Sequence, residues 1–269
     1  MRRRGFRSIT VALFSVVCLS LPAEAAPRPS SMEEQLLNLL NQERIHGGLR
    51  KVQWNQDLAD AARAHSDLLA KHKKLSHRFR GEPELQQRAG KAGAHFDAVA
   101  ENVAYAPTVP DLHDGLMHSP PHRANILNPD YNAVGIAIVE RDGELYATQD
   151  FARVIANASE EQFRQAVIAA FQKVRAAQNR APIAVHSDPR LHDAACSKSL
   201  NAKQILRGLP GATDLAIYTS SDAAHLPPNM RSAAGDGTLR RMNIGVCFQQ
   251  DSATGFSKYW VVAAFYPVQ

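Results

Sequence analysis

The strongest constraint on the fold of this chain is that its second half repeats the order of its first. The segment NQERIHGGLRKVQWNQDLADAARAHS is matched by QKVRAAQNRAPIAVHSDPRLHDAACSKS, and NAVGIAIVERDGELYATQDFA is matched later by MNIGVCFQQDSATGFSKYWVVAAFY. The matched positions are Arg44 and Arg175, Leu58 and Leu191, Asp60 and Asp193, Ser66 and Ser199, Gly135 and Gly245, and Phe151 and Phe265. The repetition favours two related domains, 32–155 and 160–269, with a boundary near 156–160, over one continuous domain.

The first 25 residues have the pattern of a signal peptide. Four arginines precede the apolar stretch ITVALFSVVCLSL, and Ala23 to Ala25 form an A-x-A cleavage pattern. The apolar stretch is shorter than the roughly 20 residues of a membrane-spanning helix, and no other segment qualifies. We therefore expect an exported protein, periplasmic or extracellular, with no transmembrane segment after cleavage.

Most of the excess positive charge belongs to this leader. Removing residues 1–25 takes away four of the 31 Lys and Arg residues and one of the 26 Asp and Glu residues, so the net charge falls from +5 to +2. A dedicated nucleic-acid surface needs clustered Lys and Arg, so we expect no nucleic-acid partner. Cys196 and Cys247 remain after cleavage; in an exported protein they could form a disulfide, although two buried thiols would look the same in sequence.

The first half reads as several helices followed by a β-hairpin. The expected helices begin at a capping box of Ser31 and Glu34, and run from Asn55 to about Lys74, from Pro83 to Gly90 and from Pro110 to His118. Asp142-Gly143 lies between two apolar runs and predicts the hairpin turn. His65 falls on the apolar stripe of its helix, so we interpret it as a core histidine.

Three short motifs resemble a known family. KLSH ending at His77, AENVA around Glu101, and SPPHRANILNPDYNAVGIAI containing His122 occur in this order. They resemble the signatures of the CAP superfamily (cysteine-rich secretory proteins, antigen 5 and pathogenesis-related proteins; the SCP domain), bacterial type, over about residues 32–153. The resemblance implies an α+β fold, a three-layer α-β-α sandwich, followed here by a smaller, diverged repeat of the same fold.

The resemblance also implies a cavity lined by two histidines and two acidic residues. His77, Glu101 and His122 take three of these positions, while Ser119 stands at the second acidic position and Leu116 at a position usually held by tryptophan. Two imidazoles and a carboxylate suit zinc or another divalent ion, so a metal is possible without being obligatory. The same groups could instead form a metal-free, pH-sensitive cluster in which Glu101 favours the protonated form of both histidines.

No residue is assigned a catalytic role from sequence. Ser119 with His122 suggests a nucleophile and base, but Ser119 precedes two prolines and no oxyanion-forming motif accompanies it. The second half has no equivalent His and Glu set, and its Tyr259, Trp260, Phe265 and Tyr266 read as strand and core residues.

The family resemblance implies a non-catalytic exported protein that binds an apolar small molecule, a lipid or a cell-envelope component in the cavity or an adjacent groove. One alternative is a metal-dependent hydrolase that uses His77, Glu101 and His122. Another is a protein-protein interaction module whose second half binds a partner. The sequence does not determine the ligand, the oligomeric state or how the two halves pack.

Overall fold

The computed structural model describes residues 29–155, 158–197 and 201–268. The predicted signal peptide, residues 1–25, lies outside the described residues, as do residues 156–157 of the predicted domain boundary. Within the described ranges, no helix is both long enough and apolar enough to cross a membrane.

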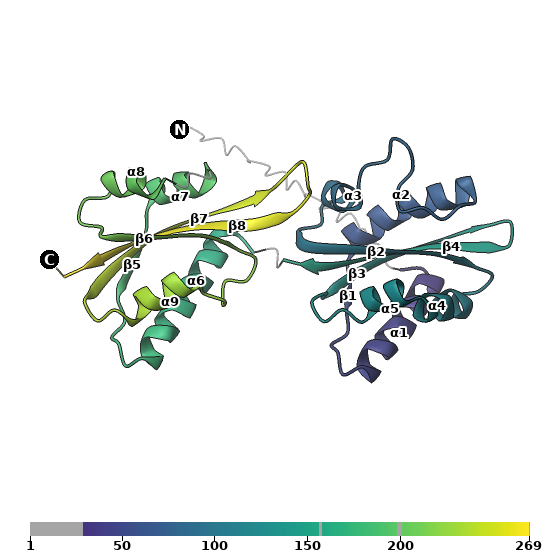
Figure 1. Ribbon diagram of the computed structural model, residues 1–269, viewed down its shortest axis with the longest axis horizontal. Helices are drawn as coiled ribbons and strands as arrows, with labels where there is room; N and C mark the ends of the chain where they lie inside the picture. The colour runs from purple at the N-terminus through teal and green to yellow at the C-terminus, as the bar shows by residue number, and fades with distance from the viewer. Residues whose placement is uncertain (1–28, 156–157, 198–200, 269) are drawn as a thin grey trace, which may run out of the picture.

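The first half is a four-stranded sheet between two layers of helices (Figure 1). Its elements are α1 (Ser31–His46), β1 (Gln53–Trp54), α2 (Gln56–His72), α3 (Leu85–Ala92), β2 (Phe96–Ala106), α4 (Val109–His118), α5 (Pro120–Ile126), β3 (Ala133–Arg141) and β4 (Glu144–Val154). The strand order is β1-β3-β4-β2, and only the β1–β3 pair among these is parallel. In Figure 1, α2 and α3 cover one face, and α1, α4 and α5 cover the other.

The second half is a separate four-stranded sheet, again between two helical layers. Its elements are α6 (Glu160–Ala177), β5 (Ala184–Ser187), α7 (Pro189–Cys196), α8 (Ala202–Arg207), β6 (Asp214–Ser220), α9 (Pro228–Gly235), β7 (Leu239–Gln250) and β8 (Ser257–Pro267). The order β5-β7-β8-β6, with β5 parallel to β7, is the order of the first sheet. Helices α7 and α8 lie on one face, and α6 and α9 on the other (Figure 1).

Each half buries an arginine at the end of its first helix. Arg44 is 1% exposed and Arg175 is 2% exposed. Each guanidinium donates from Nε to the carbonyl six residues further along, and from Nη1 to two carbonyls at the end of the short helix α5 or α9. The acceptors are Arg50, Ile126 and Asn128 for Arg44, and Ala181, Ala234 and Asp236 for Arg175.

Each half also needs a glycine where its second helix, α2 or α7, crosses the sheet. A Cβ on Gly135 would lie 2.1 Å from the backbone N of Ala59, and a Cβ on Gly245 would lie 2.1 Å from the backbone N of His192. Both helices therefore approach the strand more closely than any side chain allows. Ser66 and Ser199, which are matched in sequence, are not compared in structure, because Ser199 lies outside the described residues.

Several local expectations are confirmed and two are wrong in detail. Asn55 caps α2 by accepting from the Leu58 N–H at 2.9 Å, and Asp142-Gly143 forms the β3–β4 turn with φ values of 54° and 82°. The capping box of α1 is formed by Ser30 and Glu33, one residue earlier than predicted.

The shift of this capping box has a physical cause. The sequence SSMEE contains two overlapping Ser-x-x-Glu patterns. Glu33 is 4% exposed, accepts from the Ile138 N–H at 3.2 Å and pairs with Arg63, whereas Glu34 faces solvent. The helix α3 is also displaced, because Glu84 occupies its N-cap and its first helical residue is Leu85 instead of Pro83.

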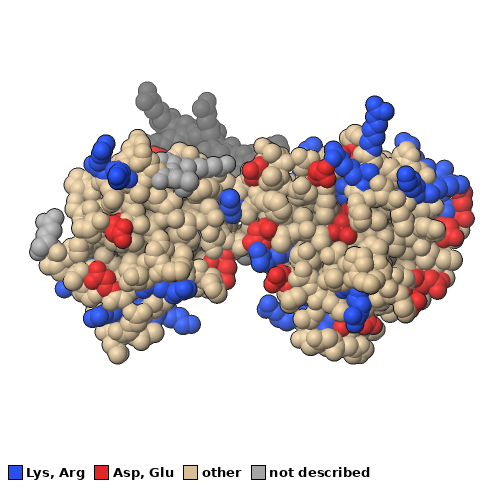
Figure 2. Space-filling view, viewed as in Figure 1, with Lys and Arg blue, Asp and Glu red and all other residues tan. Residues whose placement is uncertain are grey.

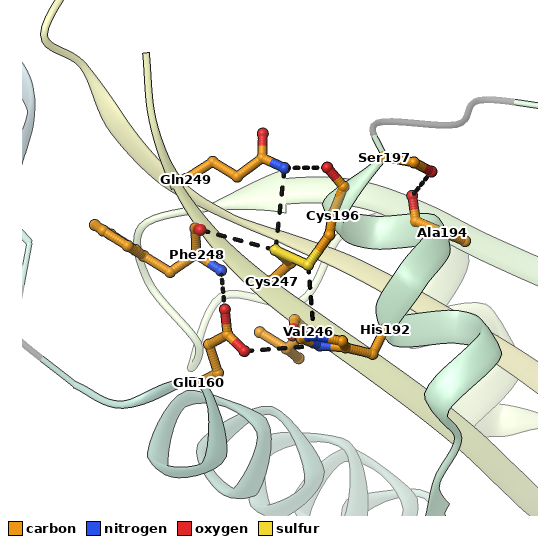
Figure 3. The surroundings of a disulfide bond; sticks show 9 residues. All are labelled: Glu160, His192, Ala194, Cys196, Ser197, Val246, Cys247, Phe248 and Gln249. Carbon is orange, nitrogen blue, oxygen red and sulfur yellow. Dashed lines mark hydrogen bonds and ion pairs between the residues drawn. A yellow bond between two sulfur atoms is a disulfide. The ribbon is translucent and has the colours of Figure 1, made fainter. Parts of the chain in front are cut away.

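A disulfide joins Cys196 at the end of α7 to Cys247 on β7 (Figure 3). The S–S distance is 2.15 Å and the bond spans 51 residues of sequence. His192 lies one turn before Cys196, with Nε2 3.5 Å from Cys196 Sγ and Nδ1 2.8 Å from the Val246 carbonyl oxygen. The disulfide and this histidine both fasten α7 to the sheet.

The β7–β8 turn of the second half reaches α3 of the first (Figure 1). Gln87 Nε2 on α3 donates to the Ala253 carbonyl at 2.6 Å, and the rings of Phe96 and Phe256 are 5.5 Å apart. The second half therefore supports the helix that carries Arg88.

Candidate functional site

The candidate site lies at the edge of the first sheet, where β2 passes the loop that joins α2 to α3. Glu101 is on β2, the edge strand of the order β1-β3-β4-β2, and is only 8% exposed. The side chains that contact Glu101 or its partners form what we call the Glu101 cluster, made up of His65, His77, Glu82, Arg88, Glu101 and Asp150.

Both carboxylate oxygens of Glu101 have cationic or hydrogen-bonding partners. Its Oε1 lies 2.9 Å from His77 Nδ1, and its Oε2 accepts from Arg88 Nη2. The side chains of Arg88 and Glu101 are 5% and 3% exposed, so this pair is withdrawn from water. A buried ion pair is stable only when its partners are well placed, and removing one partner leaves an uncompensated charge.

The loop that carries His77 is fixed to α2 by His65. This histidine is fully buried, as predicted for a core residue, but both of its ring nitrogens have polar partners. Its Nδ1 lies 2.6 Å from Glu82 Oε1 and its Nε2 lies 2.8 Å from the Ser76 carbonyl oxygen. The second oxygen of Glu82 accepts from the Phe79 N–H at 2.9 Å. These contacts hold the residues before and after His77, and so set its direction toward Glu101.

Asp150 lies under Glu101 on the neighbouring strand β4. The two residues are paired in the antiparallel ladder, and Asp150 is fully buried. Burial raises the pKa of Asp150 well above its ordinary value, and the negative charge of Glu101 raises it further, against a smaller opposing effect of Arg88. Asp150 therefore holds its proton to a higher pH than an ordinary aspartate does.

The pKa values of His77 and His122 are shifted in opposite directions. The hydrogen bond with Glu101 raises the pKa of His77, although partial burial opposes it. Burial lowers the pKa of His122, and the charge of nearby His77 lowers it further. The expectation that Glu101 favours protonation of both histidines is therefore wrong for His122.

The helix α5 that carries His122 is attached to β2 next to Glu101. Asn102 Nδ2 donates to the His122 carbonyl oxygen at 3.1 Å and to Gln149 Oε1 at 3.1 Å. Asn125 Nδ2, also on α5, donates to Asn102 Oδ1 at 2.9 Å. The asparagine beside Glu101 thus holds the second histidine near the first.

Ser119 lies at the junction of α4 and α5 and has a structural contact there. Its backbone N–H donates to the Leu116 carbonyl oxygen at 3.3 Å. Among the described residues, its hydroxyl has no hydrogen bond to His122 or to any other group. The leucine at the family's tryptophan position, Leu116, is 1% exposed and belongs to the core.

The side chains as they stand do not fit a divalent metal ion. In the described part of the chain, no group of three or more His, Cys, Asp or Glu side chains is arranged to hold one. A metal ion on Glu101 would have to displace His77 from Oε1 or Arg88 from Oε2. The metal set of His77, Glu101 and His122 stays a prediction without support from this geometry.

Sequence reasoning missed three members of the cluster: Glu82, Arg88 and Asp150. One signal was available for Asp150. The strand YATQDFARV is otherwise largely apolar, yet Thr148, Gln149 and Asp150 are three consecutive polar residues, each 0% exposed. Consecutive polar residues on a central strand place polar groups on both faces of the sheet, which indicates a functional or structural network.

A pocket of about 640 Å³ adjoins the Glu101 cluster. It lies between α2, α3 and the loop that joins them, and Glu82 and Arg88 form part of its wall. The cluster and the pocket therefore share two side chains.

The second half has apolar pairs where the first half has Glu101 and Asp150. In both halves these positions face the helix that crosses the sheet at its glycine, which is α2 in the first half and α7 in the second. The strand pairs on the α7 side are Leu215 with Ala264 and Ile217 with Val262. No carboxylate pair occupies that part of the described second sheet.

The position of His122 is also apolar in the second half. His122 lies four residues before Ile126, one of the residues whose carbonyl binds Arg44. Met230 lies four residues before Ala234, whose carbonyl binds Arg175, and Met230 is fully buried.

The family model for the cysteine-rich secretory protein family, CAP, matches residues 37–151. These residues form a CAP domain. The match begins within α1, ends within β4 and includes the motifs around His77, Glu101 and His122. The CAP domain accounts for the first half, and a second mixed sheet with its own helices follows it.

Two curated proteins of Bacillus subtilis (strain 168) are similar to the CAP domain. The uncharacterized membrane protein YlbC is 31% identical over 123 residues, which is 45% of this chain and 34% of YlbC. The uncharacterized protein YkwD is 28% identical over 121 residues, which is 45% of this chain and 47% of YkwD. The chain thus spans less than half the length of either relative.

A solved structure, an extracellular protein containing a SCP domain from Bacillus anthracis str. Ames, is 26% identical. The alignment covers 45% of this chain and 39% of that one, with a TM-score of 0.42.

Proposed function

We propose that this chain is an exported, non-catalytic CAP-domain protein that binds an apolar small molecule, a lipid or a cell-envelope component. The observation that carries this proposal is the pocket of about 640 Å³ beside a cluster whose charges are already paired with one another. Pockets of roughly 300 to 1,000 Å³ are typical of small-molecule sites. A carboxylate held by His77 and Arg88 supports a structural role for the cluster in shaping that pocket.

Export is supported by the leader and by the disulfide. Arginines followed by an apolar stretch and an A-x-A pattern are typical of secretory signals. Disulfides persist in oxidising compartments, so the Cys196–Cys247 bond agrees with a periplasmic or extracellular location.

We also propose that residues 160–269 are a diverged copy of the CAP domain. The same strand order, the buried arginine and the close-approach glycine support this kinship. The apolar pairs at the cluster positions favour a supporting or partner-binding role for this copy.

The experiment is to purify the chain, extract it with organic solvent and identify bound compounds by mass spectrometry. We expect an apolar compound in about equimolar amount. Metal content and divalent-ion affinity are measured in parallel for the parent, His77→Ala and His122→Ala. A metal present in the parent and lost in both variants, together with loss of activity toward an ester or peptide, would instead favour the hydrolase.

A further inference from the structure

The turn between β7 and β8 differs from its counterpart in the first half. The β3–β4 turn consists of Asp142 and Gly143. In the second half, the last paired residues of the two strands are Gln250 and Ser257, so the turn comprises residues 251–256. This longer turn leaves its own half and reaches the helix α3 of the CAP domain (Figure 1). The matched turns therefore differ at the point where one of them contacts the other half.

The β7–β8 turn touches α3 through glycine-to-backbone contacts. Gly255 has a left-handed backbone with φ 75°, and a Cβ there would lie 2.0 Å from the Gln86 carbonyl oxygen. On the side of α3, a Cβ on Gly90 would lie 2.9 Å from the Cα of Gly255. Gln87 Nε2 donates to the Ala253 carbonyl oxygen at 2.6 Å. Since no side chain fits between the turn and the helix, the contact is fixed at one position along α3.

Phe256 joins the turn to the apolar core of the CAP domain. Its ring centroid is 5.5 Å from that of Phe96, at an interplanar angle of 70°. It packs against the same core cluster as Ala89, which is fully buried on α3. Gln250 Nε2 donates to the Ala94 carbonyl oxygen, just beyond the end of α3, at 3.2 Å. On the face shown in Figure 2 the two halves meet at a narrow waist, so their attachment depends on a few specific contacts.

The helix α3 lies between this turn and the Glu101 cluster. Gln87 and Gly90 contact the turn, whereas Arg88 pairs with Glu101 and lines the adjoining pocket. The helix has eight residues, and so short a helix is marginal in water without tertiary contacts. A buried ion pair also needs well-placed partners. The contacts that hold α3 in place therefore also place the guanidinium of Arg88 against Glu101.

We propose that the second half is an intramolecular clamp for α3, in which Gly255 and Phe256 are positioning residues for Arg88 and, through it, for Glu101. This role needs no ligand site in the second half, in agreement with the apolar pairs at its cluster positions. The inference goes beyond the proposed binding function, because it concerns the geometry of the Glu101 cluster with or without a ligand.

The test is hydrogen–deuterium exchange of the purified full chain, followed by mass spectrometry of peptides from α3 and α4. Gly255→Ala should raise the exchange rate of the α3 amides at least tenfold and leave α4 unchanged, because its methyl group would overlap the Gln86 carbonyl. Gly143→Ala is the matched control. It has the same left-handed backbone, with φ 82°, and nothing lies within 4 Å of its Cβ, so α3 should exchange as in the parent.

A second variant changes α3 and leaves the sequence of the turn intact. Replacing Gly90 by alanine favours the helix itself. The new methyl group would however lie 2.9 Å from the Cα of Gly255 and force the turn away from α3. The clamp predicts faster exchange of α3 in Gly90→Ala, whereas a helix that is stable without the turn would exchange more slowly. The sign of this change decides the question even if Gly255→Ala unfolds the second half.

The position of Arg88 is measured from its Nε–H signal by NMR, assigned by the loss of that signal in Arg88→Lys. This N–H is buried and has no hydrogen-bond partner, so its signal is sensitive to where the guanidinium lies. We expect the signal to shift or disappear in Gly255→Ala and Phe256→Ala, and to stay unchanged in Gly143→Ala.

Either of two results would overturn the clamp. One is unchanged or slower exchange of α3 in Gly90→Ala together with unchanged exchange in Gly255→Ala. The other is an Arg88 signal that stays the same in Gly255→Ala and Phe256→Ala. Because bound compounds are identified separately by solvent extraction, failure of the clamp leaves the binding function standing, and an empty extract leaves the clamp standing.

Discussion

Glu101 on β2 lies directly opposite Asp150 on β4, so the CAP domain places two carboxyl groups side by side. His77 contacts the outer one, Glu101. Glu101 is 8% exposed and Asp150 is 0% exposed. Ionising both of two neighbouring buried carboxyl groups carries a large free-energy cost. Burial raises the pKa of Asp150 well above its ordinary value, and the negative charge of Glu101 raises it further.

Replacing Asp150 by Asn should reduce the loss of stability with rising pH. The pKa of Asp150 is raised in the folded chain, so between the unfolded value of about 4 and the raised folded value the folded chain holds a proton that the unfolded chain releases. This group therefore stabilises the fold fully below its unfolded pKa, and the contribution is lost as the pH rises toward the folded pKa. Asn keeps a donor toward Glu101 and removes the titration.

The measurement is urea unfolding of the parent and Asp150→Asn at pH 4, 6 and 8. We expect the free energy of unfolding to fall less between pH 4 and pH 8 in the variant. Asp111→Asn, at an exposed carboxyl in the first turn of α4, is the control and should behave like the parent. An equal pH dependence in all three proteins would show that Asp150 is ionised in the folded chain.

The two site histidines should titrate on opposite sides of the ordinary histidine value of about 6.5. His77 should have the higher pKa because Glu101 accepts its hydrogen bond, and His122 the lower one because it is partly buried near His77. NMR of the imidazole C–H signals measures both. Glu101→Gln should lower the pKa of His77, and His77→Ala should raise the pKa of His122.

The direction of the His77 pKa shift sets the pH range over which His77 contributes to stability. A raised pKa means that His77 contributes stability fully below its unfolded value of about 6.5, and that this contribution is lost as the pH rises through the folded value. Coincident titration of His77 and His122 in the parent would contradict the assigned contacts.

The sequence predicted the elements that depend on local chemistry. The Asn55 cap and the Asp142-Gly143 turn follow from neighbouring residues, and both are confirmed. Arg88 and Asp150 could not be assigned in this way, because their contacts with Glu101 depend on the packing of α3 and on the register of β4 against β2. The α1 cap was placed one residue late for the same reason, since the tertiary partners of Glu33 select between two equivalent local patterns.

Removing the disulfide should destabilise the second half. The bond closes a loop of 51 residues, and such a bond typically contributes about 2 to 4 kcal/mol by restricting the unfolded chain. Cys196→Ser with Cys247→Ser should therefore lower the free energy of unfolding of this half, measured by urea titration of Trp260 fluorescence with Trp54 replaced by Phe in both proteins. Histidine signals of His77 and His122 should be unchanged; a shift in them would mean that the bond also shapes the first half.

The close approach of α2 to β3 makes Gly135 the most demanding position in the CAP domain. A methyl group there would lie 2.1 Å from the Ala59 nitrogen and from the Leu58 carbonyl carbon, so backbone must move. We expect Gly135→Ala to destabilise the domain by about 3 kcal/mol or more, at the upper end of overpacking effects. Gly115→Ala on α4, where nothing lies within 4 Å, should instead stabilise it by about 0.5 to 1 kcal/mol, because alanine favours the helix.

Gly245→Ala should reproduce the large loss in the second half, since its methyl group would meet the backbone of α7 at the same distance. A small loss in Gly245→Ala beside a large one in Gly135→Ala would mean that only the first half depends on this helix-to-strand contact, and would weaken the proposed kinship of the two halves.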